Sequence, residues 1–132
     1  MSLFDMEVLK SYSTARKYNK SEVVITEGAE SPYSLYIILS GSVRVIKNYG
    51  KFEQSVVGIL KQGDFFGEMS LFMKKPRTAT IVTAEETVIL EITQKNVYEV
   101  IRSNPQMFYE ILKTLCMRID ELNNRVRSLG MK

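Results

Sequence analysis

The central part of the chain consists of short apolar runs separated by glycine-containing turns. Residues 42–47 begin as an alternating pattern, with Val43 and Val45 on one face and Arg44 on the other, which is typical of a strand with one buried face. The segment Asn48-Tyr49-Gly50-Lys51 that follows is a hairpin signal. Runs of this kind recur at intervals of about 8–12 residues, which favours a small sandwich or barrel. Strands are predicted at residues 23–25, 34–39, 42–47, 54–60, 80–82 and 87–92.

The last third of the chain changes to a helical period. Residues 94–103 fit one helix. Asn104-Pro105 ends that helix and begins another, because proline is well tolerated in a first helical turn. At the other end of the chain, the apolar residues within Leu3–Lys10 predict a short helix at best, which we place at about residues 1–12.

The last helix carries apolar residues at alternating spacings of four and three, which is a heptad seam. One interpretation is that this helix covers the open face of the β domain. The other is a parallel homodimer formed through residues 108–129. A helix of about 25 residues is ~37 Å long, as wide as a compact domain of about 100 residues, so we expect its second half to overhang and to dimerise. The seam consists of Phe108, Leu112, Leu115, Ile119, Leu122, Val126 and Leu129.

Composition indicates one ordinary soluble domain. The chain has 132 residues, of which 45% are hydrophobic and 25% charged, and this length supports a core without a disulfide or metal. The net charge of +3 is too small to indicate nucleic-acid binding. The longest apolar run, Leu35-Tyr36-Ile37-Ile38-Leu39, is too short to span a membrane, and no signal peptide is visible after Met1. We therefore expect a cytoplasmic protein.

The absence of histidine excludes several kinds of site. With no histidine in the sequence, a serine–histidine pair, a histidine-containing zinc site and a haem held by histidine are all excluded. Cys116 is the only cysteine, so the chain cannot form an internal disulfide or hold a four-cysteine metal centre. We predict no catalytic residues, no metal and no cofactor.

Residues 65–80 contain the candidate chemistry. Gly67 follows two phenylalanines and precedes a predicted helical turn at 68–72, where a glycine lets the backbone approach a ligand and free N–H groups favour an anion. Arg77 lies in a loop next to Pro76, and its planar fork suits phosphate oxygens. Glu68 is a suitable acceptor for a sugar hydroxyl. Each feature alone is weak, but their combination on a strand-rich chain is more specific.

Here the sequence resembles the cyclic nucleotide-binding domain family, over nearly its whole length. The motifs are Glu27-Gly28, the segment from Leu35 to Val43, Gly63-Asp64, the phosphate-binding cassette at 66–80, and Asn104-Pro105. The resemblance implies a mainly β fold with flanking helices, an antiparallel, jelly-roll-like β-roll followed by two C-terminal helices. It divides a single domain, 1–132, into an N-terminal helix, a β-roll at about 16–92 and C-terminal helices at about 94–129.

The resemblance also implies roles for individual residues. Glu68 accepts a hydrogen bond from the ribose 2′-hydroxyl, Arg77 pairs with the cyclic phosphate, and backbone N–H groups complete the phosphate cradle. Phe66, Met69 and Leu71 fit either the ligand site or the core equally well. The residue that caps the base belongs to the last helix. The predicted ligand-binding residues are Phe66, Gly67, Glu68, Met69, Ser70, Leu71, Arg77, Thr78 and Ala79, and the candidate caps are Arg118, Leu122 and Asn123.

The resemblance favours a regulatory module that couples nucleotide binding to movement of its last helices. The first expected ligand is cAMP. The alternative is cGMP, because in the family that this sequence resembles a threonine at the position of Thr78 often accompanies a response to cGMP, although it also occurs in members that respond to cAMP. Because the sequence stops at Lys132, we expect no DNA binding by this chain. Two alternatives are a metal enzyme on a cupin-type barrel, disfavoured because such enzymes hold metal through histidines, and a degenerate, non-binding dimerisation module, disfavoured by the intact Glu68 and Arg77.

Overall fold

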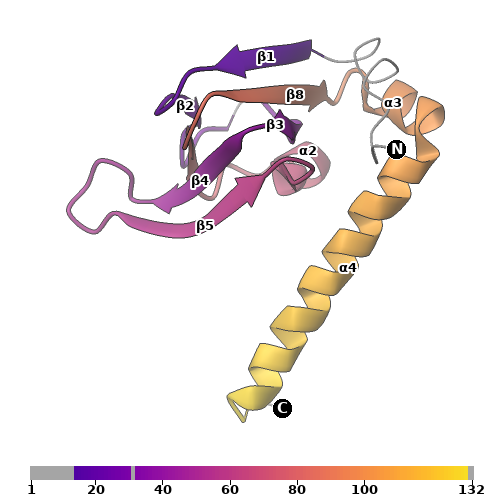
Figure 1. The fold of residues 1–132 in the computed structure, drawn as a ribbon. Helices are drawn as coiled ribbons and strands as arrows, with labels where there is room; N and C mark the ends of the chain where they lie inside the picture. The colour runs from indigo at the N-terminus through magenta and orange to yellow at the C-terminus, as the bar shows by residue number, and fades with distance from the viewer. Residues whose placement is uncertain (1–13, 31, 131–132) are drawn as a thin grey trace.

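The computed structural model describes residues 14–30 and 32–130 of the chain. Within these residues, eight strands form two four-stranded antiparallel sheets, and three helices accompany them (Figure 1). One sheet has the strand order β1-β8-β3-β6 and the other has the order β2-β7-β4-β5. The elements are β1 (Thr14–Tyr18), β2 (Val23–Ile25), β3 (Ser34–Ser40), β4 (Ser42–Lys47), β5 (Ser55–Lys61), β6 (Phe65–Phe66), α2 (Glu68–Met73), β7 (Thr80–Thr83), β8 (Thr87–Thr93), α3 (Val97–Ser103) and α4 (Pro105–Ser128).

The architecture confirms the predicted fold class. The strands build an antiparallel roll, and α3 and α4 follow it as the two C-terminal helices (Figure 1). The helix expected at about residues 1–12 lies outside the described residues. No helix in the described part of the chain is long and apolar enough to cross a membrane.

Strand β3 is buried on both of its faces, which explains its unbroken apolar run. Leu35 and Ile37 point into a cluster that they share with α2, α3 and α4. Tyr36 and Ile38 point the opposite way, into a cluster between the two sheets. Successive residues of a strand face opposite sides, so a strand covered on both sides needs apolar residues at every position. Two separate cores therefore meet back to back at β3.

Helix α3 begins later than the sequence pattern predicts. We expected helix from residue 94, but the helix begins at Val97. Residues before it form a turn, in which the Thr93 N–H donates to Asn96 Oδ1 at 2.9 Å. The side chain of Gln94 turns back and donates to the carbonyl of Leu71 at 3.0 Å. These side-chain contacts compete with the first helical turn, as asparagine often does at helix starts.

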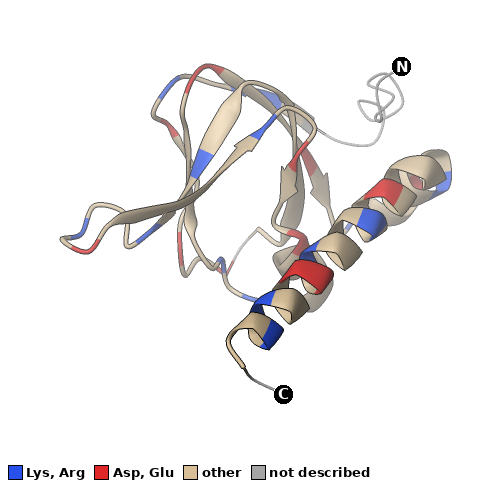
Figure 2. Cartoon of the chain, turned by 60° about the horizontal axis from the view of Figure 1, so that its bottom comes forward, with Lys and Arg blue, Asp and Glu red and all other residues tan. Residues whose placement is uncertain are grey.

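Only the first half of α4 packs on the β-roll. Met107 and Ile111 are buried in the core shared with β3 and β8, and Leu115 is partly buried against the same cluster. From Ile119 onward the apolar residues are exposed, and α4 extends away from the sheets as its length predicts (Figure 1). Basic and acidic side chains both occur along the helix, without segregation of one sign (Figure 2).

The docked half of α4 supports a first prediction. Replacing Ile111 with alanine removes a side chain that is 2% exposed, so the free energy of unfolding should fall by about 2–5 kcal/mol. Urea unfolding followed by circular dichroism, at one fixed protein concentration, measures this change. The matched control is Met117→Ala on the exposed face of the same helix, which should change stability by no more than about 0.5 kcal/mol. Equal effects of the two substitutions would contradict the docking of α4.

Candidate ligand-binding site

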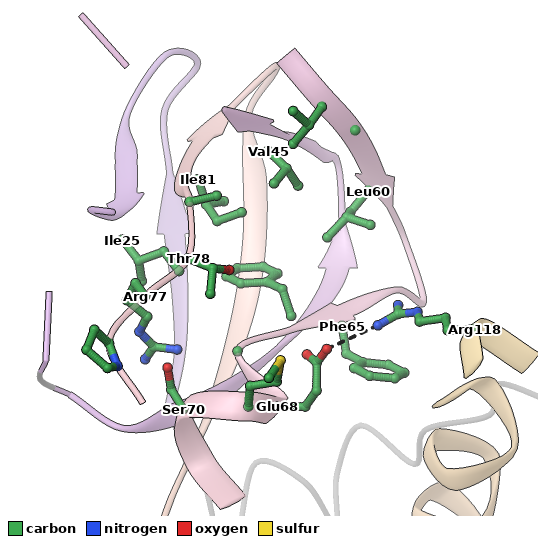
Figure 3. Close-up of a pocket in the computed structure, with 17 residues that line it drawn as sticks. Ile25, Val45, Leu60, Phe65, Glu68, Ser70, Arg77, Thr78, Ile81 and Arg118 are labelled. Atoms are coloured by element: carbon green, nitrogen blue, oxygen red, sulfur yellow. Dashed lines mark hydrogen bonds and ion pairs between the residues drawn. The ribbon is translucent and has the colours of Figure 1, made fainter. Parts of the chain in front are cut away.

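A cavity of about 370 Å³ lies between the β2-β7-β4-β5 sheet, α2 and α4. Its polar lining residues, Glu68, Ser70 and Arg77, gather near α2, whereas Val45, Leu60 and Ile81 line the part farther along the strands (Figure 3). The cavity therefore has one polar end and one apolar end. Such a site suits a ligand that is charged at one end and flat and apolar at the other.

The polar end is shaped by Gly67, which separates β6 from α2. Its backbone is left-handed, with φ of 87°. A Cβ atom at this position would lie 2.5 Å from the Ser34 carbonyl oxygen and 2.7 Å from Nη1 of Arg77. Glycine is required here both for the backbone conformation and because the Arg77 guanidinium packs directly against the chain.

Arg77 is the central charged group of the cavity. Its side chain is buried, at 4% exposure. Nη1 donates to the Ser34 carbonyl at 3.1 Å, Nη2 donates to the Pro32 carbonyl, and the guanidinium carbon lies 5.3 Å from the ring centroid of Tyr36. Burial lowers the pKa of Arg77, and that shift is opposed chiefly by Tyr36 and by the carboxylates of Glu91 and Glu68.

No carboxylate among the described residues forms an ion pair with Arg77. Carbonyl oxygens orient the guanidinium but do not neutralise it. A buried charge without a counterion is costly, so such a group is stabilised when an anion reaches it. This end of the cavity is thus suited to an anionic ligand group, and the fork geometry of arginine suits a phosphate.

Backbone contacts fix the chain on both sides of Arg77. Its N–H donates to the Ala29 carbonyl at 2.8 Å, and its carbonyl accepts from the Gly28 N–H at 2.7 Å. The Lys47 ammonium donates to the carbonyl of Thr78, the next residue. Gly28, part of the Glu27-Gly28 motif, thus helps to position the arginine.

Glu68, the first residue of α2, already has a partner. Its Oε1 accepts from Nη1 of Arg118 at 3.2 Å, and the two side chains are 19% and 40% exposed. The guanidinium carbon of Arg118 also lies 4.8 Å from the ring centroid of the buried Phe65. One residue of α4 thereby reaches across to the cassette (Figure 3).

The structure brings most of the predicted site residues to one cavity. The stacked ring of Phe66, 5.0 Å from that of Tyr36, forms part of its wall. Leu71 is different: its side chain is 3% exposed and belongs to the core shared with the helices, on the other side of α2. The predicted residues that line the cavity are Phe66, Gly67, Glu68, Met69, Ser70, Arg77, Thr78 and Ala79.

Of the three candidate caps on the last helix, only Arg118 lines the cavity. Leu122 and Asn123 are exposed and lie outside it. They follow Arg118 by four and five residues on a helix that rises about 1.5 Å per residue and leads away from the roll. Neither residue reaches the cavity in this arrangement of α4, and a role for either of them as a base cap stays a prediction.

The apolar wall of the cavity was not predicted from the sequence. Its residues come from strands that are far apart in sequence. The signal was present as alternation along β4, where Val45 and Val43 share one face, but alternation does not distinguish a cavity wall from a core. The missed lining residues are Ile25, Val45, Val57, Gly58, Leu60, Phe65, Pro76 and Ile81.

Comparison with known proteins agrees with this geometry. A family model described as "Cyclic nucleotide-binding domain" matches residues 15–104. The chain belongs to the cyclic nucleotide-binding domain family. The match covers β2 to β8, nearly all of β1, and the cassette, so every residue that lines the cavity except Arg118 lies within the matched region.

Relatives of this cyclic nucleotide-binding domain include named regulators. The cAMP-activated global transcriptional regulator CRP of Pasteurella multocida is 30% identical over 95% of this chain and 60% of its own length. The Thermus thermophilus catabolite activator protein superposes with a TM-score of 0.79 and 26% identity, over 95% of this chain and 58% of its own. The c-di-GMP-responsive global regulator CLP of Xanthomonas campestris superposes with a TM-score of 0.73 and 25% identity, over 95% and 63%.

The chain spans about half to three fifths of the length of the curated relatives that it matches. These relatives therefore carry a further region that the aligned part does not include. For that reason, the comparisons do not support our expectation that DNA binding is absent.

Tyr36, whose ring lies beside the Arg77 guanidinium, should make the stability of the protein depend on pH in the alkaline range. Burial, with a further contribution from Glu91, raises the pKa of Tyr36 to about 12, while Arg77 opposes the rise. In the unfolded chain the tyrosine hydroxyl loses its proton at about pH 10, so the contribution of the protonated Tyr36 to the free energy of unfolding is fully present below that pH. This contribution is lost as the pH rises towards about 12, and its upper limit is about 2–3 kcal/mol.

Tyr36→Phe should therefore reduce the loss of stability between about pH 9 and about pH 11. The midpoint of denaturant unfolding at each pH measures the effect. Tyr109→Phe, at an exposed position on α4, is the control and should retain the alkaline slope of the unaltered protein. The same slope in Tyr36→Phe and in the unaltered protein would contradict the assignment.

Proposed function

We propose that this chain is a non-enzymatic regulatory module that binds a cyclic nucleotide, with cAMP as the first ligand and cGMP as the alternative. The observation that carries the proposal is the buried guanidinium of Arg77, which has only carbonyl partners among the described residues and faces a cavity. The cyclic phosphate supplies the single negative charge that this group lacks. The ribose 2′-hydroxyl then donates to Glu68, and the base lies towards the apolar wall.

The size and polarity of the cavity support this assignment. Its volume of about 370 Å³ lies within the range of about 300–1,000 Å³ that is usual for small-molecule sites. The hydroxyl of Thr78 lines the cavity beside Arg77 and is the candidate contact to the base or the phosphate. The similarity to a cAMP-activated regulator favours cAMP, and the similarity to a c-di-GMP-responsive regulator identifies a second nucleotide class to include in a test.

Calorimetric titration with cAMP and then cGMP tests the proposal. We expect binding at micromolar concentration or tighter by the unaltered protein. In Arg77→Ala, affinity should fall by about 30-fold to several thousand-fold, because a desolvated charge contact to the phosphate costs roughly 2–5 kcal/mol. In Arg77→Lys, which keeps the charge and loses the fork, a smaller loss is expected.

The control for this experiment is Arg44→Ala, which removes an exposed arginine of β4 and should leave affinity unchanged. Thermal unfolding verifies that each variant is folded. Absence of heat with cAMP, cGMP and c-di-GMP by the folded, unaltered protein would favour the degenerate, non-binding alternative.

We also propose that the chain forms a homodimer through the exposed part of the α4 seam. Phe108 packs edge-on against Phe72, at 6.1 Å between ring centroids, and Leu115 packs on the β-roll, so these two seam positions also serve the chain's own core. The remaining positions are exposed, and from Ile119 onward they keep the alternating spacing of three and four that suits a second copy of the same helix. These positions are Leu112, Ile119, Leu122, Val126 and Leu129.

Leu122→Arg should convert this dimer to a monomer, because it places a charge in the centre of an apolar seam. Sedimentation equilibrium across a concentration series measures the change. The control is Met117→Arg, because Met117 is exposed and lies outside the seam. The proposal would be contradicted if the unaltered protein were monomeric at every concentration. It would also be contradicted if the Leu122→Arg variant remained as dimeric as the control.

We propose that nucleotide binding shifts the equilibrium between two arrangements of α3 and α4 relative to the β-roll. A ligand changes such an equilibrium only by its differential affinity for the two arrangements. The docked contacts of Met107 and Ile111 hold the start of α4 in place, whereas the segment beyond Arg118 lacks buried apolar residues. The second half of the helix is therefore the part that ligand binding is proposed to move.

A further inference from the structure

A carboxylate that does not line the cavity lies on the same interior face of the β-roll as the groups that hold Arg77. Glu91 of β8 is paired with Tyr36 of β3, and residues directly opposite each other in an antiparallel pair point to the same face of the sheet. Tyr36 and Ile89 both belong to the cluster between the two sheets, so Glu91 also faces the roll interior. None of the ion pairs among the described residues includes it.

Ser34 connects this carboxylate to Arg77. The Ser34 side chain is fully buried, its hydroxyl donates to Oε2 of Glu91 at 2.7 Å, and its carbonyl accepts from Nη1 of Arg77 at 3.1 Å. The ring of Tyr36 lies beside the guanidinium and opposite Glu91 in the sheet. After burial, the charge of Glu91 contributes to the raised pKa of Tyr36, and together with Tyr36 it opposes the lowering of the pKa of Arg77 by burial. Glu91 therefore acts on the guanidinium without touching it.

This arrangement limits the negative charge that the polar end of the cavity can accept. Of the described residues, Arg77 alone carries a buried charge. The charge of Arg118 is already matched by Glu68, and Lys47 makes an exposed contact to a backbone carbonyl, where water screens its charge. One negative charge on a ligand neutralises Arg77. A second negative charge would meet the carboxylates of Glu68 and Glu91 without a free buried cation.

The number of negative charges separates two kinds of phosphate ester. A cyclic phosphodiester carries one negative charge. A phosphate monoester carries about 1.5 to 2 negative charges at pH 7, because its second pKa is about 6. Hydrolysis of a cyclic nucleotide opens the ring and produces such a monoester, so the opened product differs from the cyclic ligand in charge as well as in shape.

We propose that Glu91 is a specificity-determining residue that acts through Arg77 and favours a singly charged phosphodiester over a doubly charged phosphate monoester. This inference rests on the proposed nucleotide function and adds to it a residue outside the cavity. Glu91 lowers the affinity for every anion, and the reduction in binding free energy grows in proportion to the ligand charge. The domain thereby distinguishes a cyclic nucleotide from the product of its hydrolysis.

Calorimetry at pH 8 with three ligands tests the proposal, directly for cAMP and by displacement of cAMP for weaker ligands. Adenosine 5′-methyl phosphate has an open ring and one negative charge, whereas 5′-AMP has an open ring and about two. Glu91→Gln removes the charge and keeps an oxygen for the Ser34 hydroxyl. We expect it to strengthen the binding of cAMP and of the methyl ester by roughly 5-fold, and that of 5′-AMP by roughly 25-fold, because the Coulomb energy doubles with the ligand charge.

Two variants serve as controls, and thermal unfolding verifies that each is folded. Glu91→Asp keeps the charge and should keep the discrimination against 5′-AMP. The matched control is Glu85→Gln, because Glu85 also accepts from a serine hydroxyl, that of Ser42, at 2.7 Å. Glu85 precedes β8 and does not line the cavity, so this variant should change each affinity by less than about 2-fold, as expected for a distant, screened charge. An effect of net charge alone would appear in both glutamine variants.

Each other outcome overturns the inference in a recognisable way. Equal changes for 5′-AMP and the methyl ester in Glu91→Gln, or no displacement by 5′-AMP where the methyl ester displaces cAMP, would show that Glu91 does not discriminate by charge. Weaker binding of all three ligands would make Glu91 only a support for Arg77. Failure of the methyl ester to bind either protein would assign the discrimination to ring shape. Failure of the proposed function has a separate signature, because the unaltered protein and Glu85→Gln would then bind none of the three ligands.

Discussion

The burial of one positive charge is the constraint on which the rest of the site depends. Arg77 has little contact with water, and its charge is oriented by carbonyl oxygens and the Tyr36 ring rather than by a carboxylate. To hold it there, the chain needs a glycine at 67, where a Cβ would meet the guanidinium, and a backbone fixed through Gly28 and Ala29. These contacts hold the guanidinium at the cavity without a ligand, which is the preorganisation that the proposed anion site requires.

Sequence periodicity predicted the parts of the fold that local pattern determines. The strand at residues 42–47 and the last helix lie where alternation and heptad spacing placed them. The two-residue strand Phe65–Phe66 and the strand Thr14–Tyr18 were not predicted, because the first is too short to show a period and the second carries polar residues at an edge. Pairing partners, rather than their own sequences, make these segments strands.

The candidate site was predictable as far as its residues are contiguous. The cassette is one segment, so motif and chemistry identified it, whereas the apolar wall is assembled from distant strands. Leu71 shows the limit within the cassette itself, since adjacent helical residues point in different directions and only the packed structure decides which side faces a cavity. The contact between Arg118 and Glu68 spans 50 residues, and no pattern in the sequence pairs them.

The double-sided burial of β3 has a consequence for how such a domain diversifies. Tyr36 and Ile38 pack in the roll interior, while Leu35 and Ile37 pack against the helices, so one strand separates two packing environments. Ile81 and Phe66 line the cavity and belong to the cluster between the sheets, whereas Phe65 lines the cavity and belongs to the cluster that holds the helices. A substitution at Ile81 therefore alters the cavity wall from the roll side alone, whereas a substitution at Phe65 alters the cavity wall and the packing of the helices at once.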